Sequence, residues 1–110
     1  MADKQFHLSS DQIKPGVASG YGGCIATDRI TVDGELVGYM YREVGRRPED
    51  GGWRFFAGDE TEEYLADSNH SGVYDVNTIA NYDPSIVPLL DVPYGTAFIR
   101  NDEGQWEKDS

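Results

Sequence analysis

The stretch WRFFA, residues 53–57, constrains the fold most, because it is the clearest strand in the sequence and a glycine follows it directly. Successive side chains of a β-strand point to opposite faces of a sheet. Trp53 and Phe55 therefore share one face. Arg54 and Phe56 share the other. We assign Trp53 and Phe55 to the hydrophobic core.

Four carboxylates follow this strand within five residues: Asp59, Glu60, Glu62 and Glu63. Gly58 breaks the strand, and Asp59 then stands where a helix N-cap belongs, with Glu62 three residues further on, as in a capping box. The positive end of the helix dipole favours negative charge in the first turn, where Glu60, Glu62 and Glu63 fall. The sequence therefore predicts that a helix begins here, and this placement explains the acidic cluster without any chemistry.

A β-hairpin is predicted over residues 29–44, RITVDGELVGYMYREV. Apolar side chains alternate on both arms. Asp33 and Gly34 between them suit a two-residue type I′ turn, because both tolerate positive φ. Residues 22–27, GGCIAT, precede the hairpin as the start of a buried strand, and the glycine-rich residues 45–52 follow it as a loop.

The second half of the chain predicts one more helix and one more strand. The helix spans residues 76–82, with Asp75 as its N-cap and an Asp-Pro pair at its end. Residues 85–93 are rich in aliphatic side chains and interrupted by proline, which indicates a packed turn. Residues 95–101 are predicted as the last strand, and Trp106 extends it after a turn.

These elements predict a single α+β domain with a mostly antiparallel sheet and two short helices. The 110 residues are close to the usual size of one domain and long enough to bury a core without disulfides or metals. We expect a partly ordered lead-in over residues 1–22, with a short helical turn at residues 9–13. The domain proper spans residues 23–101, and residues 102–110 form a tail that extends the last strand.

The charge of the chain is strongly negative. Nine Lys and Arg residues oppose twenty Asp and Glu residues, so the formal net charge is −11. A field of this sign repels phosphate backbones and anionic lipids, so we expect neither nucleic acid nor a membrane as partner. It would accelerate encounter with a basic protein. The alternative is that the charge serves only solubility, and composition does not decide between the two.

The cysteine count and the N-terminus both predict a cytoplasmic protein. Cys24 is the only cysteine in the sequence, which excludes an internal disulfide and a cysteine-rich zinc site. Residues 1–5 lack the apolar segment of a secretory signal. No apolar run approaches the ~18 residues that span a bilayer.

The sequence favours a protein that is not an enzyme. A nucleophilic site would have to combine Cys24 with His7 or His70, but Cys24 leads an apolar strand, where a small buried side chain is the ordinary interpretation. Asp59 and Glu63 would share one helix face as an acid–base pair, although exposed carboxylates seldom have shifted pKa values. None of the common phosphate-binding, zinc-protease or hydrolase motifs occurs. We therefore expect no catalytic residue and no cofactor.

The segment DSNHSGVYDVNT, residues 67–78, is similar to a calcium-binding loop. Its side-chain ligands would be Asp67, Asn69, Ser71 and Asp75. The twelfth position holds Thr78, whereas the loop needs a bidentate glutamate there, and losing two carboxylate oxygens costs most of the affinity. The alternative, which we favour, is a turn rich in Asn, Ser and Gly between two helices.

Three blocks of the sequence resemble a family of small bacterial proteins: TDRITVDGELVGYMYRE, GWRFFAGDETEEY and YDVNTIANYDPSIVPLLDVPYGTAF. The family was first catalogued as a domain of unknown function and was later labelled an immunity-protein domain of polymorphic-toxin systems. The resemblance covers residues 22–100, and its most specific block is residues 74–90. It implies an α+β cytosolic domain without known catalytic residues.

The resemblance further implies that the protein neutralises a toxin by occlusion. Carboxylates would steer a basic toxin or other protein, and a few aromatic side chains would anchor it. The steering patch would be Asp59, Glu60, Glu62 and Glu63. The anchors would be Tyr64, Tyr74 and Tyr82, for which core packing with the hydroxyl bonded at the rim is the stronger alternative.

Two other functions remain open at this point. One is a regulatory domain that binds a small molecule or a metal near residues 67–75, and this is the second choice. The other is an enzyme built on paired carboxylates. The sequence does not indicate an oligomeric state.

Overall fold

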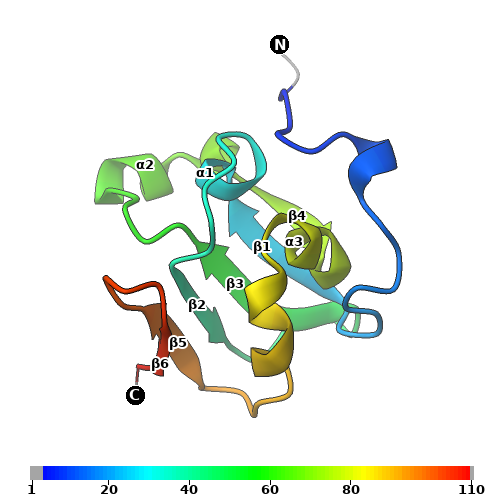
Figure 1. The fold of residues 1–110 in the computed structure, drawn as a ribbon, viewed down its shortest axis with the longest axis vertical. Coiled ribbons are helices and arrows are strands. Elements are labelled where there is room, and N and C mark those ends of the chain that lie inside the picture. Colours follow the sequence, from blue (N-terminus) through cyan, green and yellow to red (C-terminus); the bar gives the residue numbers. More distant parts are fainter. Residues whose placement is uncertain (1–3, 110) are drawn as a thin grey trace.

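The computed structural model of the protein describes residues 4–109 and contains one six-stranded sheet with short helices around it (Figure 1). The strands are β1 (Gly23–Thr27), β2 (Tyr39–Arg42), β3 (Asp50–Phe56), β4 (Ser71–Asp75), β5 (Ala97–Arg100) and β6 (Trp106–Lys108). The α-helices are α1 (Asp28–Thr31), α2 (Glu62–Ala66) and α3 (Val76–Tyr82). The 3₁₀ helices are η1 (Ser10–Gln12), η2 (Ser68–His70) and η3 (Pro84–Leu89).

The strand order across the sheet is β4-β1-β3-β2-β5-β6. Among residues 4–109, four of the five neighbouring pairs are antiparallel, and β1 and β3 run parallel, with Cys24 opposite Trp53. The prediction of a mostly antiparallel sheet is confirmed. Parallel strands cannot be joined by a tight turn, so residues 28–49 cross over to the far side of β3, where β2 pairs with it.

The predicted hairpin over residues 29–44 is wrong. Residues 28–31 form α1, a third α-helix that the sequence does not predict, and Val32 is its C-cap. Beyond the cap, the backbone N–H of Gly34 donates to the carbonyl of Ile30 at 3.1 Å. Gly34 has a φ of 81°, the left-handed conformation that commonly follows a helix. Asp33-Gly34 suits a helix end as well as a type I′ turn, and the helical turn buries Ile30 completely.

The helix predicted after Gly58 starts later than expected. Its N-cap is Thr61, whose hydroxyl accepts a hydrogen bond from a backbone N–H of the first turn at 3.1 Å. Asp59, the predicted cap, lies two residues earlier and forms an ion pair with Arg29 instead. Glu62 and Glu63 lie in the first turn, as predicted, whereas Glu60, also predicted there, precedes the N-cap.

The other predicted elements lie close to their predicted bounds. α3 begins after Asp75, whose carboxylate accepts a hydrogen bond from the backbone N–H of Asn77 at 2.9 Å, as expected for an N-cap. The packed turn contains η3, with Ile86 buried. β5 confirms the last predicted strand, whereas Trp106 begins β6, a separate strand that pairs antiparallel with β5 and does not extend it. β3 begins already at Asp50, inside the predicted loop.

The hydrophobic core lies between one face of the sheet and a layer formed by α1, α3 and η3, and Figure 1 shows α3 over this face. Trp53 and Phe55 are completely buried, as predicted, and their ring centroids lie 5.8 Å apart. The helical layer contributes the fully buried side chains Ile30, Val76, Ile79, Ala80, Ile86 and Leu90. The opposite face of the sheet carries side chains that remain partly exposed, and the candidate site lies there.

The lead-in before β1 lies along α3. The side-chain amides of Asn77 and Asn81 both donate to the carbonyl of Lys14 at 2.9 Å, and the amide oxygen of Asn77 accepts from the backbone N–H of Ala18 at 2.9 Å. The helical turn predicted in this segment is η1. Side chains of the helix therefore hold the lead-in through its main chain.

Candidate functional site

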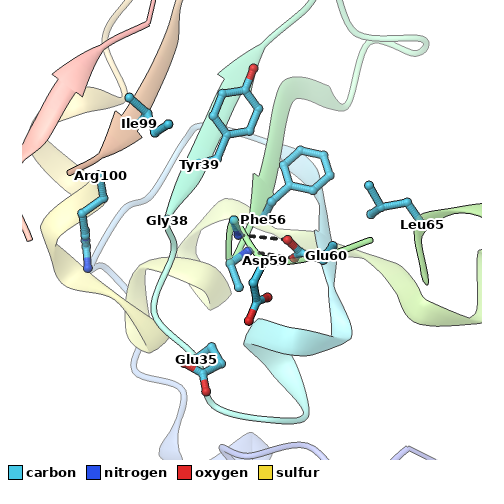
Figure 2. Close-up of a pocket in the computed structure, with 11 residues that line it drawn as sticks. Glu35, Gly38, Tyr39, Phe56, Asp59, Glu60, Leu65, Ile99 and Arg100 are labelled. Carbon is cyan, nitrogen blue, oxygen red and sulfur yellow. Dashed lines mark hydrogen bonds between the residues drawn. The ribbon is translucent and has the colours of Figure 1, made fainter. Parts of the chain in front are cut away.

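A hollow of about 550 Å³ opens between the uncovered sheet face and α2 (Figure 2). Tyr39 of β2 and Phe56 of β3 lie side by side in it, with ring centroids 5.8 Å apart. Leu65 of α2 and Ile99 of β5 line it from opposite sides, and they are 46% and 44% exposed. Four segments that lie far apart in the sequence therefore build one apolar concavity.

The alternation of the strands explains why these rings face outward. Met40 of β2 and Phe55 of β3 point into the core, so their neighbours Tyr39 and Phe56 point to the other face of the sheet. Tyr41 extends this aromatic surface, because its ring stacks on Phe56 with centroids 5.8 Å apart and an interplanar angle of 16°. The three outward rings pack against one another and stay partly exposed.

Carboxylates form the rim of the hollow on the side of α1, namely those of Glu35, Asp59 and Glu60. The guanidinium of Arg29 contacts three carboxylates, those of Asp59 at 2.6 Å, Asp33 at 3.0 Å and Glu35 at 3.7 Å. Its hydrogen bonds to Asp59 hold the pKa of that carboxyl below its usual value. One guanidinium among three carboxylates leaves this rim negatively charged.

Glu60 also has a structural role in the turn that follows β3. Its carboxylate accepts hydrogen bonds from the backbone N–H groups of Ala57 at 2.8 Å and Gly58 at 2.9 Å, drawn as dashed lines in Figure 2. It accepts another from the hydroxyl of Thr27 at 2.5 Å. This carboxylate therefore fixes one wall of the hollow.

The start of α2 divides the acidic cluster predicted from the sequence. Asp59 and Glu60 lie in the turn beside the hollow, whereas Glu62 and Glu63 are exposed on the first turn of the helix. Asp59 and Glu63 therefore do not form the predicted pair on one helix face. Within residues 4–109, Glu62 and Glu63 take part in none of the ion pairs.

The three tyrosines predicted as anchors lie outside the lining of the hollow. Tyr64 stacks on His70, with ring centroids 4.1 Å apart and an interplanar angle of 17°. Tyr82 donates from its hydroxyl to the carbonyl of Thr31 at 3.0 Å, and the hydroxyl of Tyr74 lies 3.4 Å from the hydroxyl of the same threonine. Tyr74 and Tyr82 both pack against the core, as the alternative interpretation expects.

A second, more open hollow of about 580 Å³ adjoins the first, and Tyr39 lines both. Its apolar walls include Tyr41, Val44 and Tyr94, of which Val44 and Tyr94 are 69% and 54% exposed. The guanidinium of Arg42 lies over the Tyr94 ring, 4.6 Å from its centroid. This surface therefore already contains one stacked pair of a cation and an aromatic ring.

Beside Tyr41, the same sheet face contains an ion cluster around a buried arginine. Arg54 of β3 is 3% exposed, and its guanidinium binds Asp50 and Glu43, each at 2.8 Å. The hydrogen bonds from Arg54 hold the pKa of Asp50 far below its usual value. Burial, followed by the negative charge of Glu43, raises the pKa of Tyr41. The two carboxylates compensate the charge of Arg54 and leave the cluster with a net negative charge.

The segment that is similar to a calcium loop does not have that shape. The carboxylate of Asp67 accepts from the backbone N–H of Asn69 at 2.9 Å and caps η2, and Asp75 caps α3. Between them, Ser71–Asp75 is the extended strand β4, which keeps its two ends apart. The favoured turn is present only as η2, because a strand follows it. In the described part of the chain, no group of three or more His, Cys, Asp or Glu side chains could hold a metal ion.

Cys24 is a core residue of β1. It is 1% exposed, and burial raises the pKa of its thiol well above the usual value. The thiol therefore stays protonated near neutral pH, and the thiolate is the form that attacks substrates. The position does not suit a nucleophile.

The comparisons with known proteins identify the family. Residues 24–110 match the family model of the immunity protein Imm33 domain, which covers most of the chain. The chain therefore belongs to the Imm33 immunity protein domain family, and the resemblance drawn from the three sequence blocks is confirmed. No curated protein and no solved structure matches the chain. Residues 4–109 include no helix with the length and apolar character to cross a membrane.

Sequence reasoning missed most of the hollow. It placed Phe56 on the strand face opposite the core, but it put Tyr39 in a hairpin arm and left Leu65 and Ile99 without neighbours. The available signal was Phe56 itself, because a large aromatic side chain turned away from the core needs another surface to pack on. Its partners could not be identified without the strand order.

Proposed function

We propose that this protein is an immunity protein that acts in the cytoplasm, where it binds a toxin domain and covers the surface that the toxin needs for its activity. Membership of the Imm33 immunity protein domain family is the observation that carries this proposal. Inhibition by occlusion requires a complementary surface rather than a reaction centre. The uncovered sheet face, with its two adjoining hollows, offers such a surface.

The charge of the chain supports a basic partner. A formal net charge of −11 attracts a cationic domain over long range and raises the rate of encounter. In this proposal the steering patch consists of Glu62 and Glu63 on α2 with Asp59 and Glu60 in the turn before it. Of the three predicted anchors we retain Tyr64, which lies on the same helix, because the other two pack against the core.

A combined purification and growth assay tests this proposal. The tagged protein is purified from its native cells, and the proteins that co-purify are identified by mass spectrometry. Each is then produced in a laboratory expression host with and without this protein. We expect one basic domain that stops growth when it is produced alone and is tolerated when the two are produced together.

The same assay can overturn the proposal. If no co-purifying protein stops growth, or if growth is never restored by this protein, the immunity function fails. Thermal melting of the purified protein serves as the control. Cooperative unfolding verifies that the protein used in the assay is folded.

A further inference from the structure

The hollow over Tyr39 and Phe56 leaves several large apolar side chains exposed to solvent. Leu65 and Ile99 line it from two sides and are 46% and 44% exposed, while the rings between them are partly exposed. Large contiguous apolar patches rimmed by polar groups mark interaction sites on soluble proteins. The hollow has both parts, an apolar floor and a carboxylate rim.

The carboxylate rim can accept another cation. Arg29 already contacts three carboxylates, so its own charge neutralises the equivalent of only one of them. The side chains of Glu35 and Asp59 are 54% and 58% exposed, and both line the hollow. Both oxygens of Asp59 accept hydrogen bonds from Arg29, whereas Glu35 contacts Arg29 at 3.7 Å, beyond hydrogen-bond distance. A cation of a partner would meet this negative charge, and that of Glu35 above all, at the edge of an aromatic floor.

The adjoining hollow extends this aromatic surface. Tyr39 lines both hollows, and Tyr41 and Phe56 stack beside it. The centres of protein interfaces are enriched in aromatic side chains, and their rims are polar. Three adjoining outward rings with carboxylates at one side have this composition.

We propose that a basic segment of the toxin docks across this aromatic hollow, with an arginine or lysine side chain against the Tyr39 and Phe56 rings and its charge beside Glu35 and Asp59. Apolar neighbours of that side chain pack on Leu65 and Ile99. This inference rests on the immunity function proposed above and names the surface and the partner chemistry through which it acts.

The negative charge of the protein disfavours the other molecules that could cover this surface. A second copy of this chain also carries a net charge of −11, so two copies repel each other. Nucleic acids and anionic lipids are repelled for the same reason. A cationic protein segment is the occupant that satisfies the carboxylates and covers the apolar floor at once.

A matched pair of lysine substitutions tests the docking surface. Ile99→Lys places a positive charge inside the hollow, whereas Val73→Lys places it on β4, where Val73 is 79% exposed and lies outside the lining of both hollows. Binding is measured by titration calorimetry with the toxin domain identified in the growth assay, carrying an inactivating substitution. We expect Ile99→Lys to weaken binding at least 100-fold and Val73→Lys to change it less than threefold.

A second pair tests the carboxylate rim. Glu35→Lys reverses a charge of the rim, and Glu49→Lys makes the same change at an exposed position outside both hollows. We expect at least a 30-fold loss of affinity for the first and less than threefold for the second. Near-ultraviolet circular dichroism verifies that each variant keeps its tertiary packing.

The outcomes separate this inference from the function on which it rests. If the wild-type protein restores growth but Ile99→Lys and Glu35→Lys bind as tightly as their controls, the hollow is not the docking surface and the immunity function stands. If the wild-type protein neutralises no toxin, the immunity function fails and the docking inference fails with it. If Ile99→Lys and Glu35→Lys lose affinity and their control variants do not, the result supports the docking surface and the immunity function.

Discussion

At the scale of single residues, Arg54 illustrates how a charge is tolerated inside this small domain. It lies on the sheet face opposite the core, yet it is 3% exposed because neighbouring side chains cover it. Asp50 binds the guanidinium through both carboxylate oxygens, at 3.0 and 2.8 Å, and Glu43 binds it at 2.8 Å. Removing a partner would leave a buried charge with incomplete compensation.

We predict that Asp50→Asn lowers the free energy of unfolding by about 2 kcal/mol at pH 7, because it removes a charge-assisted pair. The pKa of Asp50 is lower in the folded protein than in the unfolded chain, where it is about 3.9. Its stabilisation is therefore complete above about pH 5 and declines as the pH falls below about 4. Urea unfolding from pH 3 to pH 8 measures the difference between wild type and variant, which should shrink only at the acid end.

The exposed Asp102 provides a control for this prediction. Asp102→Asn removes the same charge from the turn before β6, and we expect it to change stability by less than about 0.5 kcal/mol at any of these pH values. A difference for Asp50→Asn that stayed constant down to pH 3 would contradict the ionic origin of the effect.

At the scale of elements, the close approach of β2 to the end of β3 shapes the hollow. A Cβ atom on Gly38 would lie 2.0 Å from the carbonyl oxygen of Ala57, and both residues line the hollow. Only glycine lets the two backbones come this close. The hydrogen bond from the N–H of Gly38 to the carbonyl of Phe56, at 2.8 Å, depends on the same approach.

We predict that Gly38→Ala destabilises the protein by about 2–3 kcal/mol, because the strands must move apart to admit the methyl group. Gly23→Ala is the matched control, since a Cβ there would meet its nearest neighbour, the carbonyl oxygen of Glu49, at 3.4 Å. Its effect should stay below about 1 kcal/mol. Thermal unfolding of both variants tests this, and equal losses would show that the approach of β2 to β3 is not tight.

Local patterns in the sequence predicted the elements whose signals are unambiguous. The core strand around Trp53 and the helix capped by Asp75 were found because alternation and capping are local properties. The hairpin was wrong because Asp33-Gly34 serves two local structures equally well. The cap at Asp59 was wrong because Arg29, 30 residues away, binds that carboxylate.

The candidate site was less predictable than the fold, because its parts come from separate elements. Phe56 was placed correctly on the outer strand face, but Tyr39, Leu65 and Ile99 meet it only through the strand order and the position of α2. Phe56 alone predicts an apolar surface on the outer face of the sheet. The hollow forms only where the four segments meet. Periodicity along one segment carries no information about the others.

At the scale of the whole molecule, the negative charge should control how fast a partner arrives. If the proposed partner is a basic toxin domain, we predict that the association rate constant falls about tenfold or more between 0.05 M and 0.5 M NaCl, while the dissociation rate constant changes little. Stopped-flow mixing measures both. An association rate that did not depend on salt would rule out electrostatic steering, although the complex could still form.

A charge-neutral variant locates the steering patch. The double substitution Glu62→Gln, Glu63→Gln should slow association about two- to fivefold, because these exposed carboxylates lie on α2, whose Leu65 lines the hollow. The double substitution Glu49→Gln, Asp91→Asn removes the same total charge from exposed positions elsewhere and should have a smaller effect. Equal effects of the two would mean that only net charge matters.

The attachment of the lead-in explains how the fold can extend beyond the part of the chain that family models match. The match begins at residue 24, but Asn77 and Asn81 bind the main chain of Lys14 and Ala18. These bonds use peptide groups of the lead-in, and Ala18 is in addition a buried side chain of the core. The folded unit is longer than the matched segment, and a protein trimmed to residues 24–110 would lose the turns that these two asparagines hold against the helix.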